Sequence, residues 1–141
     1  DQAYYEDCKL LVQNMKIEDR FHFTGRQNVL EYYSFLDVVM LTSVREAQPL
    51  VILEAYCAEV PIVATRVGNI PEMLDYDDRL LAPSKDSAKL AEGVLFLHDN
   101  PNEVKEMNER NRRKVLNLYN KEELHEKFLA MYHQLSEAAG E

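Results

Sequence analysis

The 141-residue sequence has little of what marks several common protein classes. Its four glycines form neither a dinucleotide-binding motif nor a phosphate-binding P-loop. Its two cysteines, Cys8 and Cys57, are too few for a disulfide framework, and their scarcity favours a reducing compartment. No apolar run approaches the roughly 18 residues that a membrane-spanning helix needs. Because Cys57 falls within a predicted helix, we expect it to pack in the interior.

Positive charge is also scarce, because 25 acidic residues face 16 lysines and arginines and the net charge is −9. Nucleic-acid backbones and anionic membranes attract basic surfaces, so we expect neither nucleic-acid binding nor direct membrane binding by these residues. The charge balance leaves room for a small anionic ligand, since a helix N-terminus can hold an anion without net positive charge. The one basic run, residues 110–114, adjoins several glutamates and is typical of a solvated helix face.

The rest of the composition is that of one ordinary globular domain, which we place at residues 1–141. In the first part of the chain, predicted strands alternate with predicted helices. The predicted strands are 20–24, 38–42, 62–65 and 80–83. The predicted helices are 3–16, 29–36, 49–59 and 70–74. This alternation is typical of the α/β class, here a Rossmann-like parallel sheet with flanking helices on both faces.

The last third of the chain is expected to be a helical C-terminal tail. From Ser87 onward the apolar residues follow helical spacing throughout. Asp86 or Ser87 can cap a helix that runs to His98, and Asn100 can cap the next helix, which begins at Pro101. A third helix completes the tail.

The loops that follow the predicted strands are where such folds bind ligands. One of them, residues 43–48, contains Glu46, and Glu54 follows eight residues later in the predicted helix. Between the two carboxylates, the free amides of Leu50 and Val51 at the helix N-terminus form a potential anion site. Carboxylates on either side of such a site suit the sugar hydroxyls that flank a diphosphate. The same spacing also occurs at ordinary helix starts, where glutamate favours the helix dipole, so the spacing alone leaves both interpretations open.

An ordered set of motifs surrounds these two glutamates. The motifs are FHFTG at 21–25, YSFLDV at 33–38, the Glu46–Glu54 pair followed by Ala55, VPIVATRVGNIPE at 60–72, and LAP at 81–83. Together they resemble the C-terminal half of the GT-B glycosyltransferases of family 4. The resemblance covers nearly the whole chain, and it implies half of a GT-B fold.

The resemblance implies a nucleotide-sugar donor site. Glu46 takes the place of the family's first glutamate, which lies near the donor sugar. By this resemblance Glu46 would be the catalytic residue, and its role would be to orient that sugar. Glu54 takes the place of the second glutamate, which binds the ribose hydroxyls. The family usually retains the anomeric configuration and usually needs no metal, so we expect no metal or other cofactor. The full-length protein is therefore expected to transfer a hexosyl group from a nucleotide-sugar to a hydroxyl acceptor, in carbohydrate or polysaccharide biosynthesis.

The residues between the two glutamates would hold the diphosphate. They are the loop residues Ala47, Gln48 and Pro49 with the helix residues Leu50 and Val51. By the same resemblance, Arg26 and Gln27 in the loop after the first predicted strand would meet the base. Ala47 and Pro49 stand where glycine is frequent in the family, and Pro49 removes one amide donor.

The sequence departs from the family pattern at other positions too. Glu59 replaces a usual glycine after the helix, and Asn69 replaces the second glycine of the next turn, where asparagine tolerates a positive φ. The family's arginine and lysine that clamp the diphosphate would precede Asp1, as would the first strand and the acceptor-binding N-terminal domain. We therefore expect a C-terminal half-domain that has its own N-terminal domain as a partner and is inactive alone.

Two alternatives compete with this interpretation. The chain could be a nucleotide-sugar-binding or structural GT-B half that has lost catalysis, with Glu59 and Asn69 as signs of drift. A receiver-type signalling domain would need paired acidic residues at a strand end, and the sequence has no such pair.

The four histidines lack metal-site spacing, so we expect no metal. We expect a cytoplasmic location, with the N-terminal domain as the means of reaching an inner membrane surface.

Overall fold

The computed structural model describes residues 2–138, without the side chains of residues 121–124, 137 and 138. The chain divides into two compact units, Asp1–Glu31 and Tyr32–Glu141. The helices and strands are, in chain order, α1 (Gln2–Met15), α2 (Val29–Tyr32), the 3₁₀ helix η1 (Tyr33–Phe35), β1 (Val39–Leu41), α3 (Leu50–Cys57), β2 (Ile62–Thr65), α4 (Ile70–Met73), β3 (Leu81–Ala82), α5 (Ser87–Asp99), α6 (Pro101–Leu118) and α7 (Lys121–Ala138).

The first unit contains the predicted helix α1, but the strand predicted at 20–24 is wrong. A β-strand is defined by its backbone hydrogen bonds to a neighbouring strand. Among the described residues, residues 20–24 form no such ladder. The aromatic side chains instead contact one another, with the rings of Phe21 and Phe23 centred 4.9 Å apart and those of Tyr5 and Phe23 5.2 Å apart. Gly25, at φ 64°, directly follows the segment.

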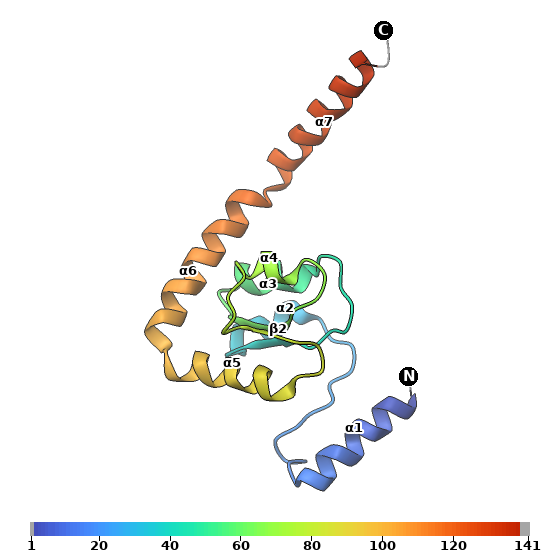
Figure 1. Cartoon of the computed structure of the whole chain (residues 1–141), viewed down its shortest axis with the longest axis vertical. Helices are drawn as coiled ribbons and strands as arrows, with labels where there is room; N and C mark the ends of the chain where they lie inside the picture. Colours follow the sequence, from blue (N-terminus) through green and yellow to red (C-terminus); the bar gives the residue numbers. More distant parts are fainter. Residues whose placement is uncertain (1, 139–141) are drawn as a thin grey trace. The chain divides into compact units, whose positions relative to one another are not determined.

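The second unit is built on a parallel sheet of strand order β1-β2-β3. Val39 pairs with Ile62 across the first ladder, and Ala64 pairs with Leu81 across the second. Every residue of the central strand β2 is buried, because α3 and α4 cover one face of the sheet and α5 covers the other (Figure 1). The α/β class with a parallel sheet and flanking helices is therefore confirmed.

Glycine allows α5 to pack closely on this sheet. A Cβ atom at Gly93 would lie 2.9 Å from the Arg79 carbonyl oxygen and 2.9 Å from Cγ1 of Val63. Both distances are shorter than real Cβ contacts, so any side chain at Gly93 would push α5 away from β2.

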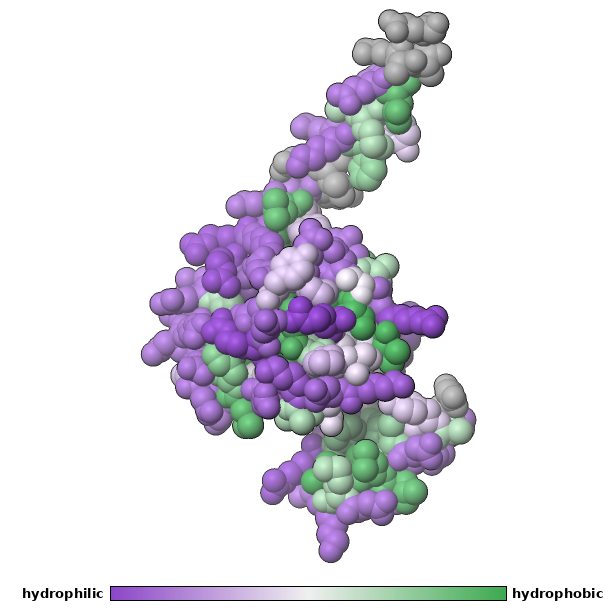
Figure 2. Space-filling view, viewed as in Figure 1, coloured by the Kyte–Doolittle hydropathy of each residue, from purple (hydrophilic) through white to green (hydrophobic). Residues whose placement is uncertain are grey.

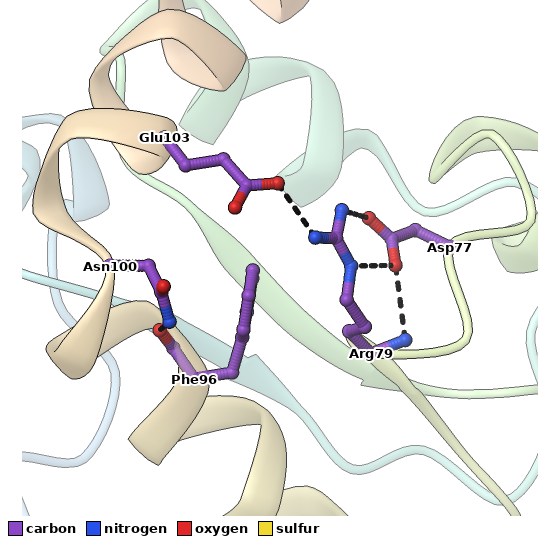
Figure 3. Close-up of polar contacts among 5 residues, drawn as sticks. All are labelled: Asp77, Arg79, Phe96, Asn100 and Glu103. Atoms are coloured by element: carbon purple, nitrogen blue, oxygen red, sulfur yellow. Dashed lines mark hydrogen bonds and ion pairs between the residues drawn. The ribbon is translucent and has the colours of Figure 1, made fainter.

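A polar cluster fixes the start of α6 beside the sheet (Figure 3). The Arg79 guanidinium donates to both carboxylate oxygens of Asp77, at 2.8 and 2.6 Å, and to Glu103 of α6 at 2.6 Å, while its Cζ lies 4.5 Å from the centre of the Phe96 ring. Hydrogen bonds from Arg79 lower the pKa of Asp77, and the two carboxylates raise the pKa of Arg79. Asn100 occupies the N-cap position of α6 as predicted, but its side chain makes no capping hydrogen bond, because its amide donates back to the Phe96 carbonyl at 2.8 Å.

The end of α3 explains how Glu59 replaces a helix-ending glycine. Glu59 adopts φ 59°, and the Val60 and Glu59 amides donate to the carbonyls of Ala55 and Tyr56, which is the hydrogen-bond pattern of a Schellman motif. The Glu59 carboxylate then accepts from Arg112 of α6 at 2.6 Å. The expectation that Cys57 is buried is wrong, since the helix ends at this residue and its side chain is exposed.

The predicted helical tail is confirmed as α5, α6 and α7. The cap predicted for α5 is present, because the Asp86 side chain accepts from the Lys89 amide at 2.9 Å. In Figure 2, α7 shows hydrophilic side chains along its left side and hydrophobic ones along its right side. Within the described residues, no helix is both long and apolar enough to cross a lipid bilayer.

Candidate functional site

The loop between β1 and α3 carries most of the predicted site. It follows the carboxyl end of β1, the expected position for a ligand site in a parallel sheet. Pro49 is buried at the N-cap position with φ −72° and ψ 120°, so α3 begins at Leu50. Among the described residues no side chain caps this helix, and no carbonyl outside it accepts from the Leu50 or Val51 amide. The positive end of the α3 dipole therefore opens onto the loop.

Glu46 is held in place through a short chain of hydrogen bonds that starts in the sheet. Thr65, the last residue of β2 and 1% exposed, donates its hydroxyl to the Ser43 carbonyl at 2.6 Å. The Ser43 hydroxyl in turn donates to Oε1 of Glu46 at 2.6 Å. One carboxylate oxygen of Glu46 is thus fixed by the protein, and Oε2 accepts no hydrogen bond from the described part of the chain.

The loop after β2 supports the Glu46 loop from behind. Gly68 adopts φ 55°, and a Cβ atom placed there would lie 1.9 Å from the Glu46 carbonyl oxygen. The amide of the next residue, Asn69, donates to the Ala47 carbonyl at 2.9 Å. The two loops that follow the neighbouring strands β1 and β2 are therefore in direct backbone contact. The expected positive φ at Asn69 is wrong, because this residue has φ −90° and only Gly68 is left-handed in this turn.

Glu54 lies in the second turn of α3 and is held by a buried tyrosine. The Tyr33 hydroxyl lies 3.2 Å from Oε2 of Glu54 and 3.4 Å from the Val51 carbonyl oxygen. Burial of the phenol, followed by the negative charge of Glu54 and its hydrogen bond, raises the pKa of Tyr33 to about 12. Tyr33 therefore keeps its proton at neutral pH and acts as the hydrogen-bond donor.

The predicted residues Glu46, Ala47, Gln48, Pro49, Leu50, Val51 and Glu54 all lie on this one loop and the first half of α3. Gln48 also reaches the tail, since its side-chain amide lies 3.5 Å from the Tyr119 hydroxyl. Arg26 and Gln27 belong to the first unit, where the Gln27 side chain donates to the Thr24 carbonyl at 2.7 Å. Their participation in the same site stays a prediction.

Three supporting residues, Tyr33, Ser43 and Thr65, did not emerge as site residues from the sequence. Ser43 lies three residues before Glu46, a spacing that suits a side-chain hydrogen bond in a loop and was the one local signal. Tyr33 and Thr65 reach the site from distant positions in the chain, which single-sequence patterns do not reveal. As for metals, the described residues include no group of three or more histidine, cysteine, aspartate or glutamate side chains placed to bind an ion.

Comparison with known proteins identifies relatives of this chain. The family described as "Glycosyl transferases group 1" matches residues 2–100. The chain is 34% identical over 134 residues to the N-acetyl-alpha-D-glucosaminyl L-malate synthase of Bacillus anthracis, a match that covers 92% of this chain and 35% of that protein. It is also 37% identical over 71 residues to the D-inositol 3-phosphate glycosyltransferase of Saccharomonospora viridis, covering 50% of this chain and 16% of that protein.

A solved structure shows the same fold. The sucrose-phosphate synthase from Thermosynechococcus elongatus superposes with a TM-score of 0.83 at 27% identity, over 96% of this chain and 35% of that one. The chain thus spans about a third of the length of the first of these relatives and of the solved structure. The expected resemblance to a half of the GT-B fold is confirmed, and the chain belongs to the glycosyl transferases group 1 family.

Proposed function

We propose that this chain is the donor-binding part of a glycosyltransferase that transfers a sugar from a nucleotide-sugar to a hydroxyl acceptor. One observation carries the proposal: Glu46 and Glu54 flank the uncapped start of α3, and each carboxylate is already held by a hydroxyl donor of the protein. Such carboxylates can accept further hydrogen bonds from sugar hydroxyls, while the helix start favours the negative charge of a diphosphate.

The proposed roles follow from position along the site. The Leu50 and Val51 amides bind the diphosphate, with Ala47, Gln48 and Pro49 shaping the loop around it. Glu54, about 6 Å further along the helix axis from Leu50, accepts hydrogen bonds from the ribose hydroxyls. Glu46, on the other side of the helix start, orients the donor sugar through the oxygen that Ser43 leaves available. Arg26 and Gln27 contact the base.

We also propose the finer features that the family resemblance implies. The transferred group is a hexosyl unit, a proposal supported by the glucosaminyl unit in the name of the Bacillus anthracis relative. The reaction retains anomeric configuration and uses no metal. The acceptor binds to an N-terminal partner domain of the full-length protein, and the remaining diphosphate contacts come from the arginine and lysine that the family carries at the start of this C-terminal half. The full-length protein acts in the cytoplasm, in carbohydrate or polysaccharide biosynthesis.

The first test is a thermal-shift titration of the full-length protein with UDP, GDP and ADP and their glucose conjugates. A nucleotide present at 100 times its Kd should stabilise the folded state by about 2.7 kcal/mol. We expect a shift with one base, and a drop in affinity of roughly tenfold or more in Glu54→Ala, since hydrogen bonds to a carboxylate are lost. Glu106→Ala, which removes an exposed carboxylate of α6, is the matched control and should bind as the wild type does.

The same titration can distinguish the roles of the two glutamates. Glu46→Gln should weaken binding of the nucleotide-sugar and leave binding of the nucleoside diphosphate unchanged, whereas Glu54→Ala should weaken both. Release of nucleoside diphosphate in the presence of acceptor extracts then tests transfer, with EDTA added to test the absence of a metal. If no nucleotide shifts the full-length protein at millimolar concentration, the proposed donor site is wrong. If nucleotides bind without any transfer or hydrolysis, the non-catalytic alternative is correct.

A further inference from the structure

We propose that Tyr33 is a positioning residue of the donor site, which orients the Glu54 carboxylate toward the ribose hydroxyls. The inference rests on the proposed function of Glu54. Tyr33 is the first residue of the 3₁₀ helix η1, and its hydroxyl contacts Glu54 of α3, which lies 21 positions later in the chain. The contact joins two elements that share no local sequence motif.

The geometry distinguishes Tyr33 from a tyrosine that only fills the core. Its ring is 7% exposed and belongs to the hydrophobic core cluster, so packing fixes the ring. Its hydroxyl lies at the edge of that core, 3.2 Å from Oε2 of Glu54 and 3.4 Å from the Val51 carbonyl oxygen. Both distances exceed the ~2.7–2.8 Å typical of hydroxyl donors, and the hydroxyl can donate to either acceptor. A phenylalanine would fill the same space but could not hold the carboxylate.

The contact has a direct consequence for ligand recognition. A glutamate on a helix surface samples several rotamers, and each side chain that is fixed on binding reduces affinity. Tyr33 restricts Glu54 before the ligand arrives and occupies Oε2. Oε1 accepts no hydrogen bond from the described part of the chain and is available for the hydroxyls of a ribose. The raised pKa of Tyr33 keeps the phenol protonated, so it donates at every pH at which the protein would be assayed.

The test compares a ribonucleotide with an analogue that lacks the hydroxyls. The full-length protein and its Tyr33→Phe variant are titrated by calorimetry with whichever of UDP, GDP or ADP binds, and with the 2′,3′-dideoxy form of that nucleotide. We expect Tyr33→Phe to lose about three- to tenfold in affinity for the ribonucleotide and less than twofold for the dideoxy form. A general loosening of the fold would weaken both ligands equally.

Tyr56→Phe is the matched control. Tyr56 is also a buried core tyrosine, 5% exposed, and its hydroxyl lies 3.4 Å from a backbone carbonyl oxygen, that of Met73, instead of a carboxylate. This variant should bind both nucleotides as the wild type does. A second check is the Glu54→Ala background, in which Tyr33→Phe should have no further effect on ribonucleotide affinity, since the group that it positions is gone.

The outcomes separate this proposal from the proposed function. If a nucleotide binds in a Glu54-dependent manner but Tyr33→Phe weakens the ribo and dideoxy forms equally, or neither, the donor site stands and the role of Tyr33 is wrong. If no nucleotide binds, or binding is indifferent to Glu54→Ala, the proposed function itself fails and the role of Tyr33 fails with it.

Discussion

Replacing Gly68 by alanine should damage the fold and the candidate site together. Gly68 lies in the turn after β2 at φ 55°, a left-handed conformation that costs a residue with a Cβ atom about 1–2 kcal/mol. Its position also faces backbone, since the added Cβ would be 1.9 Å from the carbonyl oxygen of Glu46 and 2.7 Å from the carbonyl carbon. A backbone group has little freedom to move aside.

The expected cost follows from these distances. Cβ atoms essentially never come within 3.0 Å of a heavy atom outside their own and the adjacent residues, so the Glu46 carbonyl must move by about 1 Å or more. That movement strains the loop and the hydrogen bond from the Asn69 amide to the Ala47 carbonyl, now 2.9 Å long. Overpacking of this kind costs roughly 1–3 kcal/mol. Added to the conformational term, and reduced slightly by the lower entropy of an unfolded alanine, the total loss of stability is about 2–4 kcal/mol.

Urea unfolding of wild type and variant measures this loss, and Gly25→Ala is the matched control. Gly25 has a similar φ of 64°, but nothing lies within 4 Å of its added Cβ, so only the conformational cost of about 1–2 kcal/mol applies. The displaced Glu46 should also weaken nucleotide-sugar binding more than nucleoside diphosphate binding. A Gly68→Ala variant that is as stable as Gly25→Ala and binds nucleotide-sugar normally would refute the backbone contact between the two loops.

Two further predictions concern stability. Asp77→Asn should lower stability at pH 7 by at most about 1 kcal/mol, because the carboxylate is bound by a partly exposed Arg79. The pKa of Asp77 is lowered in the folded protein, so this contribution to stability is present above the unfolded pKa near 3.8 and disappears as the pH falls through the folded pKa. A difference in stability between wild type and Asp77→Asn that persists in strong acid would contradict this prediction. Glu59→Gly should be more stable than Glu59→Ala by about 1 kcal/mol in urea unfolding, since both lose the ion pair with Arg112 and only glycine relieves the left-handed φ of 59°. Equal stability of the two would show that the end of α3 is unstrained.

The sequence predicted the elements whose signal is local. β2 is a short run of apolar residues between a proline and a turn, and its complete burial agrees with that pattern. The segment 20–24 carries an equally good strand pattern, yet a strand needs a partner that its own residues cannot specify. The prediction that Cys57 is buried failed for a related reason. Helical spacing indicates which face of α3 is buried but not where the helix ends, because a glutamate takes the left-handed position after the helix instead of the usual glycine.

The candidate site likewise combines residues that the sequence could predict with residues that it could not. Glu46 and Glu54 belong to one continuous stretch of chain, so their spacing around a helix start was visible in the sequence. The groups that hold them were not, because Thr65 reaches Ser43 over 22 positions and Tyr33 reaches Glu54 over 21. Those contacts depend on how β2 and η1 pack beside the loop, which is a property of the folded chain.

The structure also bears on whether the departures from the family pattern indicate lost function. Glu59 lies at the end of α3 away from Glu46, where a Schellman motif and Arg112 accommodate it. Asn69 has an ordinary φ of −90°, and its backbone amide makes the hydrogen bond to Ala47 that any residue except proline could make. Drift of a disused site would be expected to disrupt the groups that hold the functional side chains. Here the hydroxyls of Tyr33 and Ser43 hold the two glutamates, and Thr65 and Gly68 support the Glu46 loop, so the two substitutions provide no argument for a non-catalytic half.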